Sequence, residues 1–234
     1  MAVITQDNWL EADRRVFNSK KEYIEGALKG DTGIINGVTE ENKENIFYML
    51  MFCLCVPQSK AIKAEEAIQK LRAMKFYSET FSLTEIIKTI SKLVRFQTVK
   101  SERLIEAKNK FFDVLWSTLK QKYVLYKENK TLKEKEFVLL GVRQFLIKNV
   151  KGLGMKTSSH FLRNIGMGGL AILDIHVIDG LRKRGMIDIE KLSQSQEEYV
   201  DIEQIMKGYA ELVGISIDQL DLLLWSQKTG YVFK

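Results

Sequence analysis

Two glycines and a lysine form the stretch of this sequence whose residue types and spacing most clearly suggest chemistry. Gly152 and Gly154 are separated by one residue, and Lys156 follows two residues later. Glycines at this spacing allow a tight turn between helices and expose backbone N–H groups where the second helix begins. Such a start attracts phosphate through oriented N–H groups and the helix dipole. Taken alone, the short motif favours an ordinary helix–helix turn with glycine caps.

Lys156 changes that balance because it is expected in the first turn of the following helix. The positive end of the helix dipole disfavours a cation there. A lysine that is also partly buried would have its amine shifted toward the neutral, nucleophilic form. Nucleophilic catalysis by an amine is therefore a candidate function of Lys156.

Asp174 follows Lys156 after eighteen residues, between the apolar run LAIL and another expected helix. The more common role of an aspartate at this position is to cap the helix N-terminus. Capping and chemistry are compatible, because a capping carboxylate can also face a cleft. Asp174 is therefore both a candidate N-cap and a candidate catalytic carboxylate.

The elements that must position these residues are nearly all helices. The chain has one proline, Pro57, which favours long helices, and its β-type runs are too few and too short to organise a sheet. Helices are expected over Thr39–Val56, Ser59–Met74, Thr84–Val94, Ser101–Tyr123, a segment through Phe137–Ile147, Lys156–Ile165, from Ile175 onward, Ser195–Val213 and Ser216–Ser226. The fold class is therefore predicted to be all-α. The first forty or so residues carry no motif that can be assigned.

Composition excludes several classes of protein. The 234 residues are 45% hydrophobic and 28% charged, a balance typical of a globular protein with an ample core. The net charge of +6 permits a polyanionic partner. Cys53 and Cys55, the only cysteines, cannot form a disulfide framework or a four-ligand metal site by themselves. The longest apolar run, Ile46–Val56, is too short to span a membrane, and the N-terminus lacks a signal pattern. An intracellular location is expected.

Several segments together resemble a known family. VKGLGMK (150–156) is similar to the hairpin of the helix-hairpin-helix DNA glycosylase superfamily, and LAILDIH (170–176) to its aspartate-bearing segment. Four further segments resemble one branch of that superfamily, the type 2 8-oxoguanine DNA glycosylase/AP lyases. They are SSHFLRNIG (158–166), VPQSKA (56–61), VRFQTVK (94–100) and LDLLLWSQKTGYVFK (220–234). The resemblance covers about Phe47 to Lys234.

This resemblance implies a fold and an activity. The fold would be a single glycosylase unit over residues 1–234, made of two helical lobes with a DNA-binding cleft between them and a hairpin near residues 150–165. The activity would be excision of 8-oxoguanine from duplex DNA, followed by strand cleavage through β-elimination. Lys156 would be the nucleophile that forms a Schiff base, and Asp174 the ionised partner.

The resemblance also implies contacts with the DNA. Gly152, Gly154, Thr157 and Ser158 would present backbone amides to a phosphate. Phe96 would be a wedge that fills the stack left by the extruded base; an ordinary core aromatic is the alternative.

Base recognition is implied for a second group of residues. Pro57, Gln58 and Ser59 would line the base pocket, although a plain turn is an alternative. Trp225 would stack on the damaged base unless it is a core residue. The chain ends at Lys234, whose α-carboxylate could accept hydrogen bonds from the guanine edge; a frayed terminus is the alternative.

The sequence departs from the branch at two positions. Ile175 stands where an arginine is usual, and Thr98 where an asparagine is expected. Both departures leave the chemistry in place but affect finer DNA contacts. Without the C-terminal cysteines of some related glycosylases, no iron–sulfur cluster, other cofactor or metal is expected. The expected partner is double-stranded DNA containing 8-oxoguanine. The protein is expected to act as a monomer and not to bind a membrane.

Two alternative functions stay open. One is a glycosylase of the same superfamily for another damaged base. The other is a non-catalytic DNA-binding module that uses the hairpin only to clamp phosphate, a role that needs neither Lys156 nor Asp174.

Overall fold

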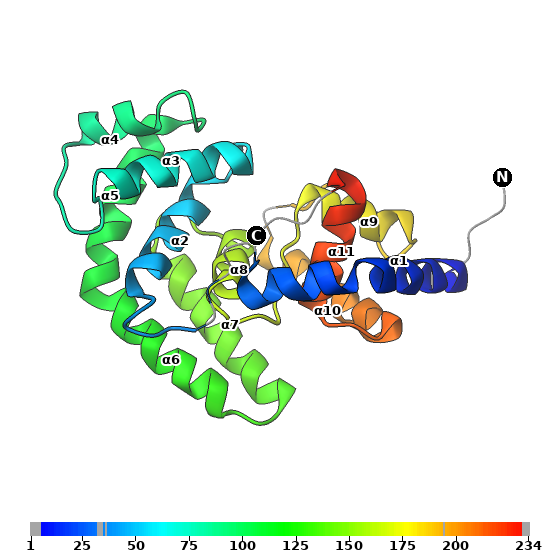
Figure 1. The fold of residues 1–234 in the computed structure, drawn as a ribbon. Helices are drawn as coiled ribbons and strands as arrows, with labels where there is room; N and C mark the ends of the chain where they lie inside the picture. Colours follow the sequence, from blue (N-terminus) through cyan, green and yellow to red (C-terminus); the bar gives the residue numbers. More distant parts are fainter. Residues whose placement is uncertain (1–5, 32–34, 36, 194, 231–234) are drawn as a thin grey trace. The chain divides into compact units, whose positions relative to one another are not determined.

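The computed structural model describes residues 6–31, 35, 37–193 and 195–230. Within these ranges the regular elements are all helical and no strand occurs, so the all-α prediction is confirmed (Figure 1). In chain order they are α1 (Gln6–Gly26), the short turn η1 (Ala27–Asp31), α2 (Lys43–Cys55), α3 (Ala61–Ala73), α4 (Leu83–Ile90), α5 (Gln97–Lys110), the π-helical turn η2 (Phe111–Leu115), α6 (Trp116–Glu128), α7 (Leu132–Asn149), α8 (Met155–Asn164), α9 (Ile175–Lys183), α10 (Gln196–Val213) and α11 (Ile217–Thr229).

The chain divides into two compact units. The first unit contains α1, η1, α9, α10 and α11, and the second contains α2 to α8 with η2. The chain passes from the second unit back to the first between Met167 and Gly168. Lys156 therefore belongs to the second unit and Asp174 to the first.

Helix α2 forms the centre of the second unit. Every residue from Ile46 to Cys55 is buried, which is the pattern of a helix covered on all sides. Helices α3, α5 and α8 pack against it. Pro57 follows two residues after the helix ends, and because proline has no N–H and clashes with the preceding turn, the helix cannot continue through it.

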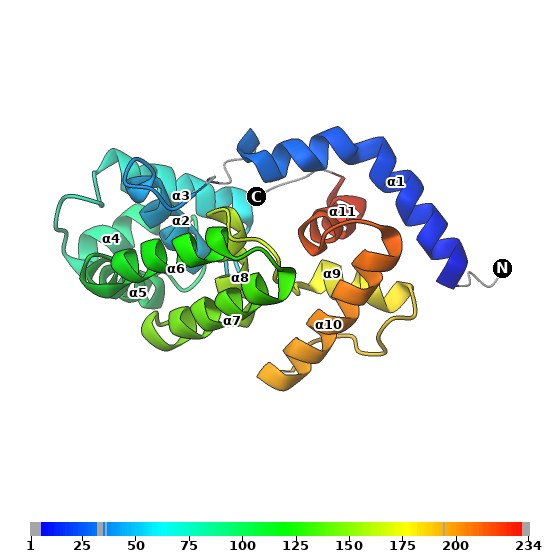
Figure 2. The same cartoon turned by 90° about the horizontal axis from the view of Figure 1, so that it is seen from below.

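Helices α7 and α8 form the helical hairpin of the second unit. A capping box between Thr131 and Glu134 starts α7, in which the Thr131 side chain accepts from the Glu134 N–H. The turn from Val150 to Gly154 then leads into α8, which begins one residue before the predicted start. The two helices pack against each other, and α6 runs alongside α7 (Figure 2).

A buried ion pair holds α1 within the first unit. Asp13 of α1 is fully buried, and Arg184, at the end of α9, donates hydrogen bonds of 2.6 Å to both of its carboxylate oxygens. The Tyr209 hydroxyl of α10 and the Gln227 amide of α11 donate to the same carboxylate at 2.6 and 3.1 Å. Burial opposes ionisation of Asp13, but the hydrogen bonds from Arg184 and Tyr209 outweigh it and hold the pKa of Asp13 below its usual value.

The structure differs from several of the predicted helices. Helix α2 begins at Lys43, four residues after the expected start at Thr39, and α3 begins two residues after the expected start at Ser59. Helix α1 was not predicted. The helix expected over Ser101–Tyr123 begins earlier, at Gln97, and continues through η2 to Glu128. The helix expected over Thr84–Val94 is α4, which begins and ends earlier because Ser82, not Thr84, is its N-cap and forms a capping box with Glu85.

Replacing Asp13 tests the ion pair. Asp13→Asn leaves Arg184 buried without a charged partner, so the free energy of unfolding at pH 7 should fall by about 3–5 kcal/mol in urea denaturation. Because the folded pKa of Asp13 is lowered, its contribution is complete above the ordinary aspartate pKa and is lost as the pH falls below it. The wild type should therefore lose more stability than the variant below about pH 4.

The matched control for this prediction is Glu11→Gln. Glu11 lies on the same helix, but its ion pair with Arg15 is exposed and long, at 3.9 Å. Its removal should cost less than about 1 kcal/mol. Equal losses in the two variants would contradict a special role for Asp13.

Candidate functional site

Lys156 is the second residue of α8 and is half-buried. Gly154 is the N-cap of that helix, so the amine-bearing side chain starts from the first turn, as the sequence predicted. No described residue of the second unit forms a hydrogen bond or ion pair with the Lys156 side chain. An amine in this setting is not neutralised by a carboxylate of its own unit, and it is available for reaction.

Gly152 occupies a backbone conformation that favours glycine. Its φ is +97°, in the left-handed region, and a Cβ built there would lie 2.8 Å from Cδ of Arg103. The side chain of Arg103, from α5, thus lies directly over the hairpin turn. The turn therefore brings a cation from another helix beside the start of α8.

The N–H of Gly154 is used inside the turn. It donates to Oγ1 of Thr157 at 2.8 Å, and the same hydroxyl donates to the Gly154 carbonyl at 3.3 Å. The first hydrogen bond of α8 runs from the Ser158 N–H to that carbonyl, at 2.9 Å. The N–H groups that precede this bond, those of residues 155–157, are the ones that an anion at this helix start would meet.

The structure does not support the expected phosphate contact of Ser158. The N–H of Gly154 already donates to Thr157, so it is not available for a phosphate. Ser158 is fully buried, and its N–H is committed to the helix. Its hydroxyl has no hydrogen-bond partner among the described residues. The sequence placed Ser158 at the helix start, but it is the fourth residue of α8, where the side chain turns into the core.

Asp174 is the N-cap of α9, as its position in the sequence predicted. A single carboxylate oxygen, Oδ1, accepts hydrogen bonds of 2.8 Å from the N–H groups of both His176 and Val177. The second oxygen, Oδ2, takes no part in capping. Asp174 is half-buried, whereas the next residue, Ile175, is 70% exposed. The carboxylate can therefore cap the helix and still offer one oxygen for chemistry.

The segment Pro57–Ser59 connects α2 to α3 and contacts the segment before α5. The exposed Gln58 has a φ of +57°, which is uncommon for a residue other than glycine. The Ser59 hydroxyl accepts a hydrogen bond of 3.0 Å from the backbone N–H of Arg95. A hollow of about 670 Å³ lies beside both segments, and four of its lining residues are basic: Lys60, Lys63, Lys92 and Arg95.

Phe96 is not a core residue. Its side chain is 54% exposed, and its backbone is left-handed at the N-cap of α5, with a φ of +58°. A bulky residue held exposed in this conformation is unusual, and strain of this kind clusters at functional sites. The geometry thus disfavours the core alternative and agrees with a wedge.

Trp225 is half-buried on α11, and its carbonyl accepts a hydrogen bond of 2.9 Å from the Thr229 hydroxyl. The fully buried core alternative is therefore not observed for this side chain. Lys234, proposed to read the base with its α-carboxylate, lies outside the described residues.

Within the described ranges there is no group of three or more His, Cys, Asp or Glu side chains that could hold a metal ion. Cys53 and Cys55 are both buried, and burial raises the pKa of the Cys55 thiol to about 12. The expectation that no cofactor is bound stays a prediction. Among the helices that are described, none is long and apolar enough to cross a membrane.

Two cations near these segments were missed by the sequence analysis. Lys100 is buried and bonds to the end of α2 and to Ser59, and Arg103 lies over Gly152. The available signal for Lys100 was its spacing: it precedes Leu104 by four residues and therefore lies on the apolar face of its helix. Arg103 gave no such signal, because its neighbour belongs to another element.

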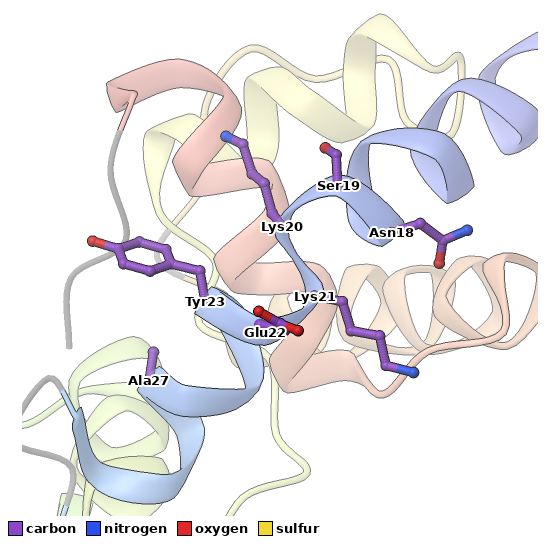
Figure 3. A pocket seen from close by; sticks show the side chains of 7 residues that line it. All are labelled: Asn18, Ser19, Lys20, Lys21, Glu22, Tyr23 and Ala27. Carbon is purple, nitrogen blue, oxygen red and sulfur yellow. The ribbon is translucent and has the colours of Figure 1, made fainter.

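A second hollow, of about 660 Å³, lies along α1 (Figure 3). Its lining residues come from Asn18 to Ala27 and include Lys20 and Tyr23. None of the residues predicted from the sequence lines it.

The chain is similar to known proteins over most of its length. The sequence model of the 8-oxoguanine DNA glycosylase family matches residues 35–215. The 8-oxoguanine DNA glycosylase/AP lyase of Fusobacterium nucleatum is 34% identical over 227 residues, which cover 94% of this chain and 95% of that protein. The protein of the same description from Saccharolobus solfataricus is 33% identical over 194 residues, covering 82% and 86%.

Two solved structures are also similar. The 8-oxoguanine DNA glycosylase of Thermotoga maritima has a TM-score of 0.78 and 26% identity, covering 98% of this chain and 100% of that chain. The 8-oxoguanine glycosylase/lyase of Methanocaldococcus jannaschii, solved with a 15mer DNA containing 8-oxoguanine, has a TM-score of 0.75 and 25% identity, covering 97% and 99%.

Thr157 and Ser158 can be separated by alanine variants. Ser158→Ala removes a buried hydroxyl that has no partner, so the free energy of unfolding should rise by up to about 1 kcal/mol while duplex affinity stays unchanged. Thr157→Ala removes the hydroxyl that holds Gly154 and should cost about 1 kcal/mol. Urea denaturation and fluorescence anisotropy with a labelled duplex measure these effects. A loss of affinity in Ser158→Ala would restore Ser158 as a DNA contact.

Proposed function

The chain belongs to the 8-oxoguanine DNA glycosylase family and is a DNA N-glycosylase and AP lyase, and we propose that Lys156 and Asp174 carry out its reaction. The observation that carries this assignment is the half-buried amine of Lys156, in the first turn of a hairpin helix and without a carboxylate partner in its unit. A hairpin that only clamps phosphate needs no such amine.

The substrate is 8-oxoguanine in duplex DNA. Its base must leave the helical stack before an enzyme can reach the glycosidic bond, at a cost of a few kcal/mol. The neutral amine of Lys156 attacks C1′ of the deoxyribose, a C–N bond forms, and the bond from C1′ to the base breaks. The departing base takes up a proton. Ring opening then gives a Schiff base between Lys156 and the sugar.

Strand cleavage follows from this Schiff base. Loss of a proton from C2′ and departure of the 3′ phosphate together form a C–C double bond, which is β-elimination. Hydrolysis of the Schiff base then releases the product and restores the amine. The same lysine can thus serve both the glycosylase step and the lyase step.

Asp174 supplies negative charge for the first step. As the base departs, positive charge develops on the sugar, and a nearby carboxylate stabilises it. The free Oδ2 of Asp174 suits this role, because Oδ1 already accepts two N–H bonds that fix the carboxylate. Asp174 can also move protons between the reacting groups.

The remaining site residues contact the DNA or the base. The hairpin turn at Gly152 and Gly154 and the start of α8 at Thr157 bind a phosphate, with free N–H groups at residues 155–157 as donors. Phe96 fills the gap in the base stack, as its exposure favours.

Base recognition is assigned to residues from two parts of the chain, the segment after α2 and the C-terminal region. Pro57, Gln58 and Ser59 line the base pocket, Trp225 stacks on the base, and the α-carboxylate of Lys234 accepts hydrogen bonds from it. We further propose that the protein acts on intracellular DNA as a monomer and needs no cofactor.

Removal of the nucleophile is the first test. Lys156→Gln keeps a similar length without an amine, so borohydride trapping of the enzyme on an 8-oxoguanine·C duplex should be abolished while binding persists. Lys151→Gln is the matched control, because Lys151 lies in the same turn but is exposed and paired with Glu106 at 3.1 Å. If Lys156→Gln is still trapped, another lysine is the nucleophile. Trapping of the wild type only on duplexes with other lesions would change the substrate.

The second test separates charge from capping at Asp174. Asn and Ser both cap helices well, so Asp174→Asn and Asp174→Ser should keep most of the stability. Both lack the negative charge, and excision should slow by about 10²-fold or more in single-turnover assays. Near-normal turnover of the folded fraction in both variants would leave Asp174 only its capping role.

A further inference from the structure

Lys100 is a buried cation that is held by three oxygen atoms, and no carboxylate among the described residues pairs with it. Its side chain is 3% exposed, and Nζ donates to the carbonyls of Cys55 and Pro57 at 2.6 and 2.7 Å and to the hydroxyl of Ser59 at 2.9 Å. An ammonium group has three N–H donors, so these three acceptors satisfy it fully. Burial lowers the pKa of Lys100 from its usual value.

The position of this ammonium group explains why a cation is tolerated there. Cys55 is the last residue of α2, where the carbonyls lack partners within the helix and the helix dipole is negative. A buried cation at this end both binds those carbonyls and meets the favourable sign of the dipole. Neutral side chains of the same length could not do both.

The same ammonium group also connects two segments of the site. Ser59, which it bonds, accepts the N–H of Arg95, and the next residue is the exposed Phe96. Both Gln58 and Phe96 are left-handed, a conformation that persists in residues other than glycine only where the surroundings enforce it. The residues that precede these two positions are each held by this cluster: the Pro57 carbonyl accepts from Lys100, and the Arg95 N–H donates to Ser59.

We propose that Lys100 is a positioning residue that fixes the base-pocket segment Pro57–Ser59 and the wedge residue Phe96 relative to each other. The proposal rests on the function assigned above, because it takes these residues to extrude and read the damaged base. Lys100 itself touches neither base nor sugar. It acts by holding two short segments in one arrangement before DNA binds.

This role predicts a selective defect. Excision of 8-oxoguanine needs both segments, whereas a preformed abasic site has no base to extrude or to read. Lys100→Met removes the three hydrogen bonds and should slow excision about 10- to 100-fold, with abasic-site cleavage within about 3-fold of the wild type. Both rates are measured in single turnover and divided by the fraction of enzyme that borohydride traps on abasic DNA.

Lys108→Met is the matched control. Lys108 lies on the same helix α5, and its Nζ donates to the carbonyls of Phe76 and Glu79 at 2.7 and 2.5 Å. Burial lowers its pKa as well, but the turn it holds contains no site residue. Its loss should leave the ratio of excision to abasic cleavage unchanged.

Hydrogen exchange gives a readout that does not depend on activity. In Lys100→Met, amides of residues 57–59 and 95–97 should exchange faster together, whereas in Lys108→Met they should not. If Lys100→Met does not fold, Lys100→Arg replaces it, because arginine keeps the charge but presents a planar fork instead of three converging donors.

The outcomes distinguish this proposal from the function on which it rests. Two outcomes would overturn the positioning role. One is an unchanged ratio of excision to abasic-site cleavage in the Lys100 variant, and the other is an equal change of that ratio in Lys108→Met. Failure of the wild type to excise 8-oxoguanine would instead refute the proposed substrate. In that case hydrogen exchange still decides whether Lys100 joins the two segments.

Discussion

The burial of α2 from Ile46 to Cys55 is the constraint on which the second unit depends. A helix that is apolar on every side must be covered on every side, and α3, α5 and α8 supply that cover. Each of these helices brings part of the site: α8 carries Lys156, α5 begins after Phe96, and α3 follows the segment Pro57–Ser59. Because protein interiors are close-packed, none of the three can shift without disturbing the same core. The hydrophobic core and the proposed site residues of the second unit are thus positioned by one set of contacts.

The proposed site residues lie at or near helix ends, and this follows from the all-helical fold. Inside a helix the backbone bonds to itself, so unsatisfied N–H and carbonyl groups are found only at its ends. Asp174 and Phe96 are N-caps, and Lys156 is in a first turn. Local side chains compete for the same groups, as Thr157 does at Gly154. What a ligand can bind is therefore what capping leaves over, namely the N–H groups of residues 155–157 and one oxygen of Asp174.

Sequence patterns predicted the parts of this architecture that depend on local chemistry. The break after α2 at Pro57, the start of α8 after two glycines and the capping by Asp174 are each decided within a few residues, and all three were predicted correctly. Helix α1 was missed because its principal contact pairs Asp13 with a residue 171 positions away. From the sequence alone, a charged residue of this kind is interpreted as a solvent-exposed surface residue, because its distant partner is not known. Lys100 was missed for the same reason, since its acceptors are more than forty residues distant.

Buried charges have equivalent roles in the two units. In the second unit, the Lys100 ammonium group donates to the carbonyls of Cys55 and Pro57 and to the Ser59 hydroxyl, which also accepts the N–H of Arg95. In the first, Arg184 ends the helix that Asp174 begins, and Asp13 joins it to α11, which carries Trp225. Removing Asp13 leaves Arg184 buried without its charged partner, and removing Lys100 leaves carbonyls at the end of α2 without a donor. Either loss costs more than losing a surface ion pair. In each unit, helix ends that carry proposed site residues are therefore held by buried polar interactions that take no part in the proposed chemistry.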